Sequence, residues 1–179
     1  MSIRRIIRMG HPVLRQVARP VPRKAIGTAP LGRLINDMVD TLHDYGGIGL
    51  AAPQVGESLR LAIVEIDGGP GGIGDIPSMP LTVFINPEVT VIDPETTGNW
   101  EGCLSVPGLR GFVERPRHIR VNALTASGAR QELELEGFLA TVFQHEFDHL
   151  DGRLYIDRLQ DPAKLVFEKE FLRYHATGD

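Results

Sequence analysis

The segment 145–149 (His-Glu-Phe-Asp-His) constrains this chain more than any other feature. Apolar residues and histidines recur at steps of three and four through it, which predicts a helix over about residues 137–150. On that helix the two histidines lie one turn apart on one face, where both imidazoles can reach the same metal ion. Glu146 is rotated by about a quarter turn and can reach a water on that metal without being a ligand. The segment therefore predicts a metal-dependent hydrolase.

The size and composition of the chain bound the other possibilities. A chain of 179 residues with 42% apolar and 23% charged side chains can bury a real core, so we expect residues 1–179 to form a single catalytic domain. The net charge of -4 gives no support for sequence-specific nucleic-acid binding, and no apolar run is long enough for a membrane span. The lone cysteine and the lack of a signal-peptide pattern favour a reducing compartment. We expect the bacterial cytoplasm rather than an organelle.

The first 36 residues are basic, with no acidic residue before Asp37. A mitochondrial presequence has this composition, but four prolines interrupt any long amphipathic helix, which favours a basic face of the mature domain instead. Such a face favours a polyanionic partner such as ribosomal RNA near the peptide exit.

Local patterns predict an α+β fold, with mixed or antiparallel sheets around the helix at 137–150 and with an N-terminal and a C-terminal helix. Residues 1–30 are expected to form an extended arm, and 68–80 a long mobile loop. The other predicted elements are a helix starting near Thr28 and ending at Gly46-Gly47, strands at 60–67, 81–86, 88–93, 119–125 and 131–136, and a last helix starting at Asp161-Pro162. The apolar residues of this last helix that are expected to pack on the core are Leu165, Val166, Phe167, Phe171 and Leu172.

A third metal ligand is needed, because a catalytic site usually has three protein ligands and one open position. One candidate is Cys103, which follows a glycine on a short strand-and-turn segment. The other is Glu168 or Glu170, in the layout typical of peptidases with two histidines and one glutamate. Basic residues surround these glutamates, so a solvated, ion-paired helix face explains them, and we favour Cys103. The non-catalytic alternative is a closed site with four protein ligands in an adaptor that docks on ribosomes.

A second segment, 47–56 (Gly-Ile-Gly-Leu-Ala-Ala-Pro-Gln-Val-Gly), combines small residues with an amide. Small residues allow a peptide backbone to approach closely, and the Gln54 amide can donate to a polarised carbonyl oxygen. A glycine-rich turn entering a strand would explain the same residues.

Three segments, 47–54, 101–105 (Glu-Gly-Cys-Leu-Ser) and 145–149, together resemble the motifs of the peptide deformylase family. Each is ungapped and all occur in the family's order, and with 11–15 and 150–152 the similarity spans most of the chain. The resemblance implies hydrolysis of the N-formyl group from the formyl-methionine of newly made polypeptides, with release of formate.

The resemblance also implies roles for particular residues. Glu146 would be the general base and acid, while the Gln54 side chain and the Leu104 backbone N–H would contact the formyl oxygen. One divalent ion is implied, Fe²⁺ in many members, which Zn²⁺, Ni²⁺ or Co²⁺ can replace. Its implied ligands are Cys103, His145 and His149.

Substrate contacts follow from the same resemblance. The backbone around Ile48, Gly49 and Gly102 is expected to pair with the peptide as an added strand. Arg110 would meet a substrate carbonyl, or else be a solvated turn residue. Phe138, Thr141 and Val142 are also expected to contact the substrate, with Thr141 in the pocket for the first side chain. Thr141 stands where such enzymes tend to place a larger aliphatic residue, which implies looser selection of methionine.

Overall fold

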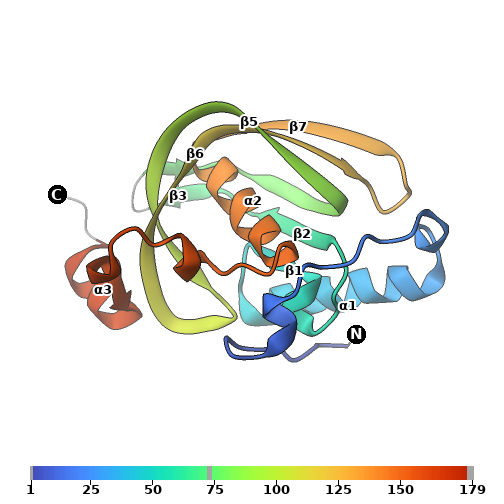
Figure 1. Cartoon of the computed structure of the whole chain (residues 1–179), viewed down its shortest axis with the longest axis horizontal. Coiled ribbons are helices and arrows are strands. Elements are labelled where there is room, and N and C mark those ends of the chain that lie inside the picture. The colour runs from blue at the N-terminus through green and yellow to red at the C-terminus, as the bar shows by residue number, and fades with distance from the viewer. Residues whose placement is uncertain (1, 72–73, 177–179) are drawn as a thin grey trace.

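A computed structural model describes residues 2–71 and 74–176. Its helices and strands are α1 (Ala29–Tyr45), β1 (Gly49–Ala51), β2 (Leu61–Ile66), β3 (Gly69–Gly71), β4 (Gly74–Ile76), β5 (Met79–Cys103), β6 (Val106–Leu124), β7 (Arg130–Glu136), α2 (Gly137–Leu150), β8 (Leu165–Phe167) and α3 (Glu168–Tyr174). In Figure 1 the long strands β5 and β6 curve around α2. Within the described ranges, no helix is both long and apolar enough to cross a membrane.

The main sheet has six strands, all paired antiparallel, in the order β1-β2-β5-β6-β7 with β8 also joined to β6. An apolar core covers each face. In β2, Ala62 and Val64 pack with α2, whereas Leu61 and Ile63 pack with α1. This strand is therefore apolar at successive positions instead of alternating, as expected for a strand buried on both faces. The predicted α+β fold is confirmed.

Helix α1 matches its prediction because both of its ends carry clear signals. Pro30 lies in its first turn, where the missing N–H is not needed. Gly46 follows the helix with φ 68°, in the left-handed conformation that ends helices.

Helix α2 is also confirmed, and its polar residues are buried as well as its apolar ones. Phe143, Phe147 and Leu150 pack into the core under the sheet. On other faces of the helix, His149 is only 1% exposed and Glu146 only 5%. Buried polar groups require partners, so the arrangement around α2 determines the site.

Two predictions for the middle of the chain are wrong. Residues 68–80 do not form a simple loop, because Gly69 pairs with Ile76 in a small β3–β4 ribbon, although residues 72 and 73 lie outside the described ranges. The predicted break at Asn86-Pro87 is a bulge within the continuous strand β5. Asn86 takes a left-handed φ of 52°, the register with β6 shifts there, and pairing resumes beyond it.

The predicted C-terminal helix from Asp161 is also wrong. A single 3-10 turn at Pro162–Lys164 leads into β8, and α3 begins only at Glu168. β8 pairs with Leu109–Gly111 of β6, a part of that strand which β7 does not cover. The unpaired backbone N–H and C=O groups there can be satisfied by a strand but not by a helix. As a result, Leu165, Phe167 and Leu172 stay exposed instead of packing on the core.

Candidate active site

Strand β5 and helix α2 meet in regularly spaced pairs of side chains. Alternate residues of a strand face one side about 6.7 Å apart, and every fourth residue of a helix advances about 6.0 Å. The two repeats match closely enough to form three successive pairs. They are Asn99 Nδ2 with Thr141 Oγ1 at 3.0 Å, Glu101 Oε2 with His145 Nδ1 at 2.7 Å, and Cys103 Sγ with His149 Nε2 at 3.4 Å.

Cys103, His145 and His149 offer metal-ligand atoms that all lie within 4.8 Å of one another. Because Glu101 holds His145 Nδ1, the Nε2 of that ring is left for a metal. Burial alone would raise the pKa of the Cys103 thiol, but the charges and hydrogen bonds of the two histidines outweigh burial and hold the pKa well below its usual value. A thiolate with two imidazoles is a donor set that suits Zn²⁺ or Fe²⁺. These residues therefore fit a divalent transition metal.

A buried network of ion pairs holds Glu101, the residue that contacts His145 Nδ1. Arg115, only 3% exposed, donates to both oxygens of Glu101 at 2.6 and 3.0 Å and to Asp148 at 2.8 Å. Arg158 donates to Asp148 at 2.6 Å. Burial would raise the pKa of the Glu101 carboxyl, but its bonds to His145 and Arg115 lower it, and the pKa of Asp148 is lowered against burial by Arg158 and Arg115. Both carboxylates are thus held ionised, and Glu101 fixes the orientation of the His145 ring.

Replacing Arg115 with Met is expected to lower the free energy of unfolding by about 3–5 kcal/mol at neutral pH, because the buried Glu101 loses its arginine partner and Asp148 loses one of its two. Urea denaturation would measure the loss. The difference from wild type should shrink as the pH falls through the lowered folded-state pKa values of Glu101 and Asp148, where the wild type also loses this stabilisation.

The matched control is Arg117→Met. Arg117 is 51% exposed and pairs with Asp93 and Glu95 at the surface. Its loss should change the free energy of unfolding far less than the loss of Arg115, because exposed ion pairs contribute little. Equal effects of the two substitutions would contradict a structural role for the buried network.

Glu146 lies in the same buried region with an incomplete set of partners. Its Oε2 is buried without a hydrogen bond among the described residues. Burial raises the pKa of its carboxyl group. A Cβ added to Gly49 would fall 2.5 Å from Glu146 Oε1, so only glycine lets the backbone of β1 pass this close to the carboxylate.

The Gln54 amide is oriented by its surroundings. Its Oε1 accepts from the Ala51 N–H at 2.8 Å, which turns its NH₂ group toward Cys103 Sγ at 3.6 Å and Ser105 Oγ at 3.4 Å. Gln54 is 1% exposed, so this orientation is fixed by packing. The NH₂ group and the turn residue Leu104 border the same cavity.

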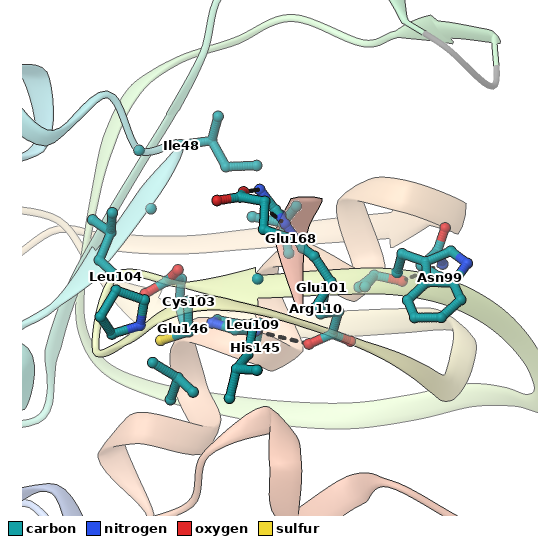
Figure 2. Close-up of a pocket in the computed structure, with 18 of the residues that line it drawn as sticks. Ile48, Asn99, Glu101, Cys103, Leu104, Leu109, Arg110, His145, Glu146 and Glu168 are labelled. Carbon is teal, nitrogen blue, oxygen red and sulfur yellow. Dashed lines mark hydrogen bonds and ion pairs between the residues drawn. The ribbon is translucent and has the colours of Figure 1, made fainter. Parts of the chain in front are cut away.

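The cavity has a volume of about 570 Å³ and opens above the metal-ligand group. In Figure 2, Leu104 and Cys103 lie toward one end and Asn99 toward the other. All of the residues expected to contact substrate line this cavity: Ile48, Gly49, Gly102, Arg110, Phe138, Thr141 and Val142.

The rival ligands from the C-terminal helix have other partners. Glu168 accepts two hydrogen bonds from Arg110, at 2.6 and 3.1 Å, and both side chains lie at the cavity wall. Glu170 is exposed to solvent. Neither belongs to the metal-ligand group found among the described residues. Arg110 lies in strand β6 and is half buried, so its interpretation as a solvated turn residue is wrong.

Besides Glu101, three residues near the site were given no role from the sequence. Ser105 contacts the Gln54 amide, Asn99 contacts Thr141, and the Tyr155 ring stacks on His145 with centroids 6.0 Å apart. Asn99 had a usable signal, because it precedes Glu101 and Cys103 at the same two-residue step. Tyr155 and Ser105 had none, since their contacts depend on the tertiary arrangement.

Comparisons of sequence and of structure with known proteins match the same family. The profile of the polypeptide deformylase family matches residues 3–165. A peptide deformylase of Leptospira biflexa is 42% identical over 95% of both chains, and peptide deformylase 1 of Bordetella pertussis is 47% identical over 92% of both. The crystal structure of a class I type b peptide deformylase from Acinetobacter baumannii with bound Met-Ala-Ser superposes with a TM-score of 0.82 at 36% identity, covering 89% of this chain and all of that one.

Proposed function

The chain belongs to the polypeptide deformylase family, and from this premise we propose that Cys103, His145 and His149 hold the metal ion on which that family depends. The chain is a hydrolase that removes the N-formyl group from newly made polypeptides. We propose that residues 1–179 act as one catalytic domain. The observation that carries the site assignment is the convergence of the three ligand atoms within 4.8 Å, beside a buried carboxylate that lacks a partner.

We propose Fe²⁺ as the native ion, with Zn²⁺, Ni²⁺ or Co²⁺ able to replace it. Cysteine and histidine donors suit all of these metals, so the donor set alone does not choose among them. Family membership favours Fe²⁺, which would make activity sensitive to air because both Fe²⁺ and the thiolate oxidise. Elemental analysis of protein purified without air tests this assignment, and zinc as the only metal present would contradict it.

The proposed mechanism assigns each step to a side chain of this protein. When bound, the ion acts as a Lewis acid that lowers the pKa of a water molecule and polarises the formyl carbonyl. Glu146 accepts the proton of the attacking water and then passes it to the departing amine. The Gln54 NH₂ and the Leu104 N–H donate to the formyl oxygen as negative charge develops there. Ile48, Gly49 and Gly102 pair with the peptide backbone, and Arg110 meets a carbonyl further along.

Formate release from formyl-Met-Ala-Ser by the purified protein tests the proposed site as a whole. Activity should depend on bound metal, disappear with a strong chelator and return when Fe²⁺ or Ni²⁺ is added back. Activity that survives complete removal of metal would contradict the proposal.

Gln54→Ala is expected to lower kcat by about 10²–10³-fold, the usual effect of removing one donor to a developing oxyanion. Metal content should not change, because Gln54 is proposed to act on the substrate. The single-turnover rate of formate release measures the effect. Retention of more than half of the wild-type rate would remove Gln54 from the mechanism.

We also propose a cytoplasmic location in bacteria and contact with the ribosome through the basic arm. Arg5 and Arg8 are exposed, whereas Arg4 is engaged by Asp37 and Glu57. Exposed arginines attract phosphates without reading sequence. Arg5→Ser with Arg8→Ser should therefore reduce co-sedimentation with ribosomes, and an unchanged ribosome-bound fraction would exclude this contact.

A further inference from the structure

The Asn99–Thr141 pair lies beside the metal-ligand group but has no part in the mechanism above. Thr141 precedes His145 by four residues, so it lies about 6 Å along α2 from that ligand. Asn99 precedes Glu101 by two residues on β5 and faces the same helix. Both residues line the cavity, and Figure 2 shows Asn99 toward the end away from Leu104. The pair therefore forms one end of the space into which a substrate can extend.

The hydrogen bonds of this pair are incomplete at Asn99. Thr141 is 3% exposed; its hydroxyl oxygen receives the Asn99 Nδ2–H at 3.0 Å, and its own O–H is directed to the Gly137 carbonyl at 3.4 Å. Asn99 is half buried and uses one of its two amide hydrogens on Thr141. Among the described residues, its second N–H and its carbonyl oxygen have no further partner. These atoms are also not among the fully buried unpartnered ones, and Asn99 lines the cavity, so we take them to be available to a ligand there.

The distance from the metal-ligand group fits the first side chain of a formylated peptide. Five bonds separate the formyl carbon from the sulfur of methionine, which spans about 6 Å when extended. That is the same distance as from His145 to Thr141 along the helix. Phe138 and Val142 supply apolar contacts along the first side chain of the substrate. Asn99 supplies a hydrogen-bond donor near the end of that side chain.

We propose that Asn99, positioned by Thr141, lets this pocket accept formylated peptides whose first side chain ends in a hydrogen-bond acceptor, methionine sulfoxide in particular. The inference rests on the proposed function of the site. An entirely apolar pocket would strip water from the sulfinyl oxygen without replacing the hydrogen bond. Here the free N–H of Asn99 supplies that hydrogen bond. Such a bond should raise kcat/KM for the sulfoxide peptide about 2- to 12-fold relative to a pocket without the donor.

The test compares kcat/KM for formyl-Met-Ala-Ser with that for its methionine sulfoxide analogue. The wild-type values should lie within about threefold of each other. Asn99→Asp keeps the size of the side chain but removes its donor, so it should lower the sulfoxide-to-methionine ratio of kcat/KM by about 2- to 12-fold. Thr141→Val, which removes the positioning contact, should give a smaller change in the same direction. Asn122→Asp is the matched control, because Asn122 is exposed on β6 and does not line the cavity.

A second measurement separates this proposal from the proposed function. The dissociation constants of the deformylated peptides, Met-Ala-Ser and its sulfoxide, should show the same ratios in calorimetry with metal-loaded protein. Loss of turnover with intact binding ratios would contradict the catalytic assignment while supporting the pocket. Wild-type protein that rejects the sulfoxide peptide more than 10-fold in both assays overturns the proposal, and so does a ratio that Asn99→Asp leaves within twofold.

Discussion

Glu146→Gln is expected to lower kcat for formate release by about 10²–10⁴-fold, because glutamine keeps the shape of the side chain but cannot carry a proton between water and amine. The structure gives the carboxylate no structural partner to lose: its Oε2 is buried without a hydrogen bond among the described residues. Burial also raises the pKa of Glu146, which favours return of the proton to the departing amine.

The metal content of Glu146→Gln should equal that of wild type, because Glu146 is not part of the group formed by Cys103, His145 and His149. Metal analysis of the same sample is therefore the necessary companion measurement. Glu170→Gln is the matched control, since Glu170 is exposed, does not line the cavity and is not part of the metal-ligand group. A metal-free Glu146→Gln protein would make Glu146 a ligand or a structural support, and a kcat above one tenth of wild type would exclude it as the base.

Elements of this fold that carry their own start, stop and periodicity could be predicted from sequence. α1 has Pro30 at its start and a left-handed Gly46 at its end, and the β6–β7 hairpin turns at Ser127-Gly128 between alternating strands. These signals are local, and the tertiary contacts of these elements favour the same structure as the local sequence.

Elements that depend on distant pairing were not predictable. The segment after Asp161 has a sound helix-start signal, yet it forms only one 3-10 turn, because the free edge of β6 at Leu109–Gly111 takes the next residues as a strand. The bulge at Asn86 likewise allows β5 to continue where Asn-Pro predicts a break. In both places backbone pairing to a strand far along the chain overrides local propensity.

The candidate site was largely predictable because its residues repeat with the periods of their elements. Glu101 and Cys103 are separated by two residues on a strand, and His145 and His149 by four on a helix, so each set lies on one face. That the two faces meet, with Asn99 and Thr141 as a further pair, depends on the curvature of β5 around α2. Curvature of this kind has no local signal in the sequence.

Cys103→Ser is expected to weaken metal binding by more than the roughly 100-fold that loss of a supporting residue can cost, and to abolish formate release. A serine hydroxyl does not ionise at neutral pH, whereas His149 and His145 hold the pKa of the Cys103 thiol well below its usual value against the effect of burial. Two imidazoles alone would then have to retain the ion, which is poor coordination for a divalent metal.

The informative comparison is with Glu168→Gln, since Glu168 was the rival third ligand. The Glu168 carboxylate accepts its two hydrogen bonds from Arg110 and is not part of the metal-ligand group. The Glu168→Gln variant should therefore still hold one metal ion per chain. Any fall in kcat/KM should come from a higher KM, because Arg110 would lose the partner that positions it. Metal lost from Glu168→Gln and retained at wild-type affinity by Cys103→Ser would reverse the assignment. Because Cys103 is the one cysteine of the chain, a thiol reagent gives an independent measurement on wild-type protein. The thiol should react slowly when metal is bound and quickly after chelation, and equal rates in both states would mean that the sulfur is not a ligand.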